Sequence, residues 1–165
     1  MKIPVELKIA ALILASCGFY TYVGHLVPQK EVQPPAEVEI SQDISTEEMV
    51  AIGAEIASGK GLCLTCHTIG KSGSLRFPDL SGIGSRCKTR IDGMDGLEYL
   101  AQSLYEPDVF IVDGFNPGMP AISKPPIGLS SDEIMCVIAW LQSMGGEADV
   151  TLETPHAYNT DAGDQ

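Results

Sequence analysis

Two thiols and an imidazole at close spacing are the residues of this sequence that could do chemistry. Cys63, Cys66 and His67 stand in the order Cys-x-x-Cys-His, a pattern typical of covalent haem attachment. The spacing has a physical reason. The two sulfurs must reach two vinyl groups on one edge of the macrocycle, while the next side chain offers a nitrogen to the iron. We therefore predict one covalent haem c, with Cys63 and Cys66 as thioether sites and His67 as an iron ligand.

Two other chemistries of paired cysteines fit the sequence less well. A zinc site needs four ligands, usually as a second pair at close spacing, whereas Cys87 and Cys136 are single and His25 and His156 are distant. A thioredoxin-like dithiol needs a preceding strand in a βαβ context, and no convincing alternating pattern is present. The haem interpretation is therefore the one that the rest of the sequence has to support.

The elements that must position this motif are helices. A capping box at residues 45–48 predicts a helix over residues 46–58. A second capping box at residues 130–133 predicts another helix, which Gly145-Gly146 stops. Apolar residues at helical spacing predict a shorter helix over Leu97–Tyr105. Since no strand is expected, the fold class predicted for the domain is all-α.

With these helices around the motif, the sequence resembles class I c-type cytochromes over about residues 46–146. In that family the first and last helices cross, and Gly53 in the first helix indicates such close packing. The resemblance implies that the carbonyl of Pro78 accepts the second N–H of His67, which fixes the tautomer and raises the basicity of the ligand. Trp140 is similar to the aromatic residue that packs at the helix crossing.

The second axial ligand has to be chosen among six methionines. In the family this ligand lies in a loop between the last two helices and is often followed by proline, as in Met119-Pro120. Met94 sits in a polar turn with little to shield a thioether, and Met1 is excluded by its position. The three methionines on predicted helices are expected to fill the core (Met49, Met135 and Met144). The resemblance therefore implies Met119 as the second metal ligand, which leaves the iron no vacancy for a substrate.

The charges of the chain are unevenly distributed. Of a net charge of −12, residues 28–45 carry −3 and residues 146–165 carry −5. In contrast, residues 60–90, here called the basic segment, hold six cations and one acid (Lys60, Lys71, Arg76, Arg86, Lys88 and Arg90, with Asp79). We therefore expect a locally positive docking face that meets an acidic partner, and no nucleic acid.

Within the basic segment, a cation could also pair with a haem propionate through charge-assisted hydrogen bonds. The candidates are Arg86, Lys88 and Arg90, and Arg86 is the one assigned to cofactor binding. The alternative for each of them is a solvated surface charge, which contributes little.

The N-terminal segment is apolar enough to reach a membrane. Ile9 to Val27 is a run of nineteen residues without a formal charge, and as a helix it would reach roughly 28 Å. This favours one transmembrane helix with its N-terminus in the cytoplasm. The alternative is a lipoprotein signal, because Leu14–Cys17 resembles a lipobox in which Cys17 becomes lipidated. Both put the following domain on the periplasmic side of the inner membrane.

The predicted organisation has four parts. Residues 1–27 form the membrane anchor, residues 28–45 a linker rich in proline and glutamate, residues 46–146 the cytochrome c domain, and residues 147–165 an acidic tail. Cys87 and Cys136 are left over, and either form a disulfide in an oxidising compartment or remain buried, inert thiols.

The expected function is that of a one-electron carrier and not of an enzyme. The partners expected are the membrane and redox proteins, either subunits of a respiratory oxidoreductase complex or proteins that a tethered shuttle visits, without a small-molecule substrate. The alternative is a haem sensor or haem enzyme with an open or labile distal site, against which Met119-Pro120 argues.

Overall fold

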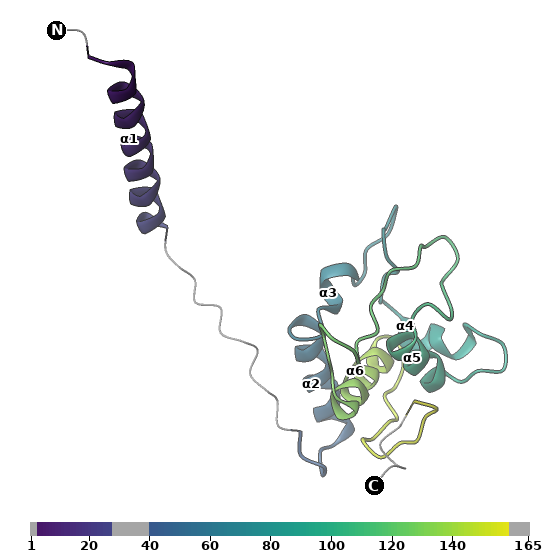
Figure 1. Ribbon diagram of the computed structural model, residues 1–165. Coiled ribbons are helices and arrows are strands. Elements are labelled where there is room, and N and C mark those ends of the chain that lie inside the picture. Colours follow the sequence, from purple (N-terminus) through teal and green to yellow (C-terminus); the bar gives the residue numbers. More distant parts are fainter. Residues whose placement is uncertain (1–2, 28–39, 159–165) are drawn as a thin grey trace. The chain divides into compact units, whose positions relative to one another are not determined.

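The computed structural model describes residues 3–27 and 40–158 and divides the chain into two units, one N-terminal to residue 37 and one from Glu37 onward. The first unit contains α1, Val5–Leu26, a helix of 22 residues without a buried side chain (Figure 1). By length and composition α1 could cross a membrane, and it is the one helix of the described residues that passes this test. A secretion signal would pass the same test. Cys17 is exposed on α1, so both predicted forms of the anchor stay open.

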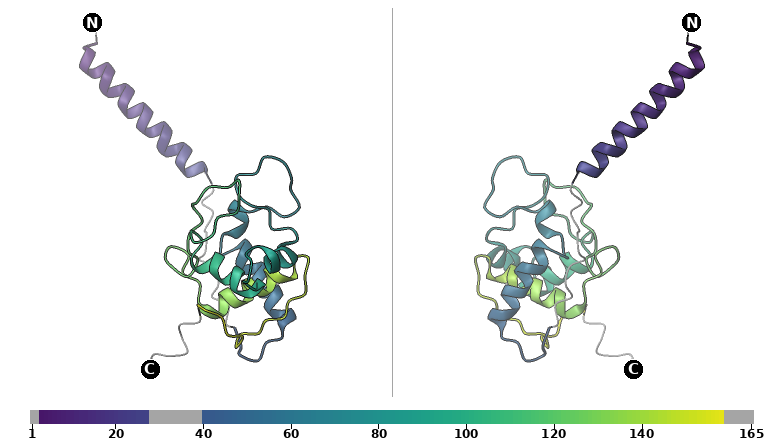
Figure 2. Two further views of the ribbon diagram at one scale, coloured as in Figure 1. Left: turned by 90° about the vertical axis from the view of Figure 1, so that its right-hand side faces the viewer. Right: turned by 90° about the vertical axis from the view of Figure 1, so that its left-hand side faces the viewer.

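The second unit is all-helical, as predicted. It contains α2 (Thr46–Ser58), α3 (Cys63–Cys66), α4 (Ile83–Arg86), the 3₁₀ helix η1 (Cys87–Thr89), α5 (Gly96–Tyr105) and α6 (Ser131–Ser143). No strand occurs between residues 40 and 158. The two views of Figure 2 show α2, α5 and α6 at the centre of this unit, with long loops around them.

Helices α2 and α6 begin where the sequence predicts. The side chains of Ser45 and Ser130 accept the N–H of the residue three positions on, and the glutamates at those positions complete both capping boxes. Helix α5 begins at Gly96, with Asp95 accepting the N–H of Glu98 at 2.8 Å. Helices α3, α4 and η1 were not predicted, because three or four residues are too few to show a helical periodicity.

The crossing of α2 and α6 brings the two backbones into contact. A Cβ atom on Gly53 would lie 2.0 Å from the carbonyl oxygen of Cys136 and 2.9 Å from Cβ of Trp140. Only glycine fits there, which confirms the close packing predicted for Gly53 and places Trp140 at the crossing. Residues 133–142 of α6 are all buried, so α6 is the centre of the core.

The compact part of this unit extends beyond the expected helices at both ends. Ile40 and Ile44, from the predicted linker, pack against the core. From the predicted acidic tail, Val150 is 1% exposed, and its carbonyl accepts the hydroxyl of Thr46 at 3.1 Å. Residues 147–158 therefore pack against the domain, whereas residues 28–39 and 159–165 lie outside the described residues.

Cys87 and Cys136 are free thiols in the structure, so the disulfide is not formed. Both are completely buried, and burial raises the pKa of each thiol, to about 11 for Cys136. A thiol that resists ionisation is a poor nucleophile, so these cysteines fit the alternative of inert core residues.

Candidate haem-binding site

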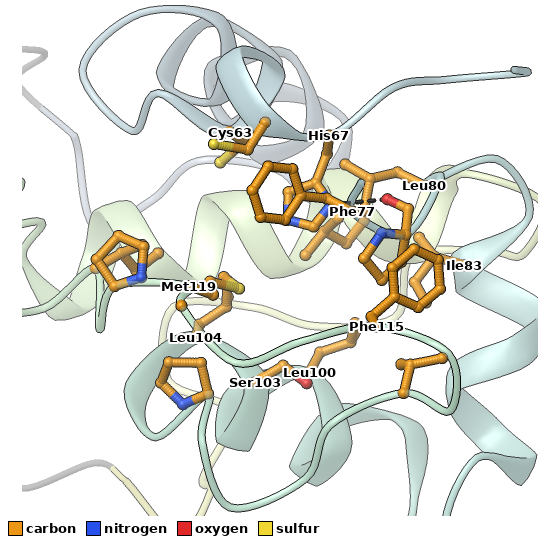
Figure 3. A pocket seen from close by; sticks show the side chains of 18 of the residues that line it. Cys63, His67, Phe77, Leu80, Ile83, Leu100, Ser103, Leu104, Phe115 and Met119 are labelled. Atoms are coloured by element: carbon orange, nitrogen blue, oxygen red, sulfur yellow. Dashed lines mark hydrogen bonds between the residues drawn. The ribbon is translucent and has the colours of Figure 1, made fainter. Parts of the chain in front are cut away.

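One largely apolar cavity of about 360 Å³ collects most of the residues that the sequence singled out. Cys63, Cys66 and His67 line it from the side of α3, and Met119 lines it from the loop between α5 and α6. Its remaining walls come from residues 77–83, from α5 and from α6. In Figure 3, His67 and Met119 lie on facing sides of the cavity. His67 and Met119, which are 52 positions apart in sequence, thus lie at one site.

The attachment motif is folded as one helical turn. The N–H of His67 donates to the carbonyl of Cys63 at 2.8 Å, and Leu62 adopts a left-handed conformation with φ of 55° directly before the turn. Gly61 is buried against α2, where a Cβ atom would lie 2.9 Å from the carbonyl of Ile56. This contact fixes the motif to the end of α2. Both thiols therefore reach the cavity from one side, with Cys66 exposed to solvent.

The imidazole of His67 is oriented by a hydrogen bond. Its Nδ1 lies 2.8 Å from the carbonyl oxygen of Pro78, as the resemblance implied. A carbonyl can only accept, so Nδ1 carries the proton and Nε2 keeps a lone pair. A neutral imidazole with one nitrogen held in this way can offer the other to a metal.

Asp79 closes the loop that presents the Pro78 carbonyl. Its carboxylate accepts the hydroxyl of Thr68 at 2.6 Å and the N–H groups of Gly70, Lys71 and Ser81 at 2.9–3.0 Å. These bonds, led by the one from Thr68, hold the pKa of Asp79 well below its usual range. This role of Asp79 was not predicted from the sequence, although its bond to the N–H of Ser81, two residues on, belongs to a local turn that aspartate commonly makes.

Arg86 lines the cavity, but its guanidinium also braces the same loop. It donates to the carbonyl of Asp79 at 2.8 Å and to the carbonyl of Ser81. Two donors of Arg86 are thus engaged with backbone groups that neighbour Pro78.

Arg90 lines the cavity as well, and its Nε is buried without a hydrogen-bond partner among the described residues. Leaving a buried charged donor unpaired is costly, so this position favours an anionic group in the cavity. Haem carries two propionates, and Arg90 offers them a donor that the protein does not otherwise satisfy. Together with the ligand set, this orphaned donor shows that the cavity fits haem c.

On the opposite wall, Met119 is half-buried and packs against the core. The backbone at Gly118 has φ of 136°, which a residue with a side chain rarely adopts. The other methionines of the described residues do not line the cavity: Met49 and Met135 are buried in the core, and Met94 and Met144 pack against it. Among the methionines of the described residues, Met119 is thus the one that lines the cavity.

A helical fold around an apolar cavity, with a Cys-x-x-Cys-His turn on one wall and a methionine on the other, defines a haem-binding class of protein. Residues 50–145 match the family model of cytochrome c, and the chain belongs to this family. Its members are in general electron carriers, not catalysts, with covalently bound haem c and typically outside the cytoplasm. No curated protein matches the chain.

Replacing Asp79 by asparagine should destabilise the domain, and by less at about pH 3 than at neutral pH. Because the pKa of Asp79 is lowered by folding, its contribution is present above the usual aspartate pKa of about 4 and is lost as pH falls toward the folded value. Urea unfolding of both proteins at pH 7 and at about pH 3 measures this. Asp92→Asn, at an exposed carboxylate, is the matched control. Parallel pH dependences of Asp79→Asn and the unchanged protein would contradict the role assigned to Asp79.

Proposed function

We propose that this protein is a membrane-tethered carrier of single electrons with one haem c. The observation that carries the proposal is the placement of His67 and Met119 on facing sides of one cavity whose edge holds Cys63 and Cys66. Haem c, when bound, would supply a one-electron couple between ferric and ferrous iron. The protein would bind it, orient it and keep water from it.

Each residue has a separate task in this proposal. Cys63 and Cys66 would form the thioether bonds, and Nε2 of His67 would bind the iron because Nδ1 is occupied by Pro78. Met119 would fill the sixth position, favour the reduced state and leave no site for oxygen or a substrate. Arg90 would pair with a propionate, while Arg86 holds the loop.

The proposed location is the periplasmic face of the inner membrane. Helix α1 has about 33 Å of length at 1.5 Å per residue, enough for a hydrocarbon core. Members of the family typically lie outside the cytoplasm. We infer that α1, or a lipid on Cys17 after cleavage, keeps the haem domain at the membrane, where it serves a respiratory complex as a subunit or a shuttle.

Replacing Met119 by leucine tests the proposed electron-carrier site. The oxidised protein should lose the weak long-wavelength band that marks methionine–iron bonding, its reduction potential should fall, and the reduced protein should begin to bind carbon monoxide. Met94→Leu is the control, because it is a volume-conserving change outside the cavity and should cost less than about 1.5 kcal/mol of stability without a spectral change.

The spectrum and carbon monoxide binding of the unchanged protein decide between the electron carrier and the alternative. If it lacks the long-wavelength band and binds carbon monoxide without any substitution, the sixth position is open. The haem sensor or haem enzyme would then replace the electron carrier as the better account.

The proposed docking surface is an apolar patch with cations beside it. Within residues 40–158, the exposed large apolar side chains all lie on two segments next to the cavity, residues 62–69 and residues 109–111 (Leu62, Leu64, Ile69, Val109 and Ile111). Of the basic segment, Lys60 is paired with Glu133 at 2.8 Å and Arg86 with backbone carbonyls. Lys71 and Arg76 are exposed, and Arg76 lies over the ring of Phe77 at the cavity. Lys88 is exposed as well, but Lys71 and Arg76 lie between the attachment motif and Pro78, and these two are the cations proposed to meet an acidic partner.

Reversing both charges, as Lys71→Glu and Arg76→Glu together, should slow oxidation by an anionic complex such as hexacyanoferrate(III). The decrease should be about tenfold at low salt and shrink above ~0.1 M, where the Debye length is about 10 Å. Stopped-flow rates with a cationic cobalt(III) complex should change in the opposite direction. Lys124→Glu, outside the basic segment, is the control. Oxidation rates that do not depend on ionic strength in any variant would contradict a positive docking face.

A further inference from the structure

Residues 147–158, here called the C-terminal strap, lie beyond the part of the chain that matches the family, yet they are fixed to the domain. The end of the strap contacts α5 and the residue that follows it. The N–H of Ala157 donates to Glu98 at 3.0 Å, and the hydroxyl of Tyr158 donates to Glu106 at 2.9 Å. The ring of Tyr158 stacks on that of Tyr105, with centroids 5.3 Å apart and planes at 9°. The strap therefore clamps α5 at both ends, through Glu98 in its first turn and through Tyr105 and Glu106 at its C-terminal end.

His156 is the buried residue of this clamp, with 8% of its surface exposed. Its Nδ1 accepts the N–H of Tyr158 at 3.2 Å, so Nε2 carries the proton, and its ring centroid lies 5.8 Å from that of Tyr105. Nε2 is buried and has no hydrogen-bond partner among the described residues. A second proton would have to go to Nδ1, where it would break the bond to Tyr158 and bury a charge.

The clamped turn of α5 also forms part of the cavity. Leu100, Ser103 and Leu104 line the cavity, as does Pro107 just after the helix, and Figure 3 shows Leu104 next to Met119. The carbonyl of Leu104 accepts the N–H of Ile122 at 3.0 Å, which fixes the far end of the loop that carries Met119. The loop thus leaves from, and returns to, the turn that the strap holds.

We propose that the C-terminal strap is a pH-sensitive brace for the Met119 loop, in which neutral His156 keeps the brace closed and its protonation loosens it. His156 is a positioning residue in this proposal, because it acts through α5 and does not reach the cavity. The brace itself rests on contacts among described residues. Only its consequence for the iron rests on the proposed function, in which Met119 is a ligand.

The direction of the pH effect follows from the surroundings of His156. The charged and titratable groups around it are Glu98 on α5, Glu106 after α5, the phenols of Tyr105 and Tyr158, and Lys124, which shares a hollow with these two tyrosines. Burial lowers the pKa of His156, and the opposing effect of Glu98 is smaller. A lowered pKa means that the contribution of the neutral ring is present above the usual histidine value of about 6.5 and is lost as pH falls below it.

Native-state hydrogen exchange of the haem-loaded, full-length protein tests the brace. After correction for the intrinsic pH dependence of exchange, amides of residues 108–122 should exchange about tenfold faster at pH 5 than at pH 7.5, because protonation of His156 favours the open state. Amides of α2 should keep their protection. His156→Gln keeps an acceptor and cannot titrate, so it should abolish the acid response.

Two controls make the outcome specific. His25→Gln, at the other histidine outside the attachment motif, should leave the acid response unchanged. Tyr158→Phe keeps the ring stack and removes the bond to Glu106, so it should speed exchange of the loop equally at both pH values. The proposal is overturned if the loop of the unchanged protein ignores pH, if His156→Gln responds to acid as the unchanged protein does, or if α2 loses protection together with the loop.

A failure of the brace can be distinguished from a failure of the proposed function. The long-wavelength band of the oxidised protein, recorded on the same samples, reports whether Met119 is a ligand. If the band persists at pH 5 while the loop loses protection, the brace is supported and the bond between Met119 and the iron does not depend on it. If the band is present but exchange of the loop does not depend on pH, the brace is refuted and the electron-carrier proposal is unaffected.

Discussion

The hydrogen bond from Nδ1 of His67 to the carbonyl of Pro78 is the interaction on which the proposed site depends. It decides which ring nitrogen carries the proton and therefore which one faces the cavity. The direction of a backbone carbonyl depends on the conformation of the main chain, so the loop around Pro78 has to be held in place by other residues. Asp79 and Arg86 hold it, the first through N–H groups and a hydroxyl, the second through two carbonyls. The hydrogen bonds within this irregular loop thus act together to hold the Pro78 carbonyl in position for His67.

The helices provide the fixed frame for this network. Because Gly53 lets α2 and α6 meet backbone to backbone, the end of α2 and the attachment turn that follows it are set against α6. The opposite wall depends on α5, whose last turn lines the cavity and anchors the Met119 loop. The two proposed iron ligands, His67 and Met119, are therefore carried by separate loops that meet only through the helical core. Functional residues on loops above a rigid scaffold are a common arrangement.

The parts of this structure that could be predicted from the sequence are those with local signals. Both capping boxes specify where α2 and α6 start, and the Cys-x-x-Cys-His motif specifies its own chemistry. Met119 required the family resemblance, because a methionine between two helices carries no local signal. The tasks of Asp79 and Arg86 depend on which carbonyls and amides the folded loop exposes, which spacing does not reveal. The strap lies in the stretch predicted as an acidic tail, because its charges are a visible signal in the sequence whereas the packing of Val150, His156 and Tyr158 on the domain is not.

The proposed function stands on Cys63 and Cys66 together holding one haem. Mass spectrometry of the intact, denatured protein after alkylation of free thiols tests this attachment. We predict a mass increased by one haem, with Cys63 and Cys66 protected from alkylation and Cys87 and Cys136 alkylated. Protein made with a working haem-attachment system that carries no covalent haem, or in which Cys63 and Cys66 are alkylated, would contradict it.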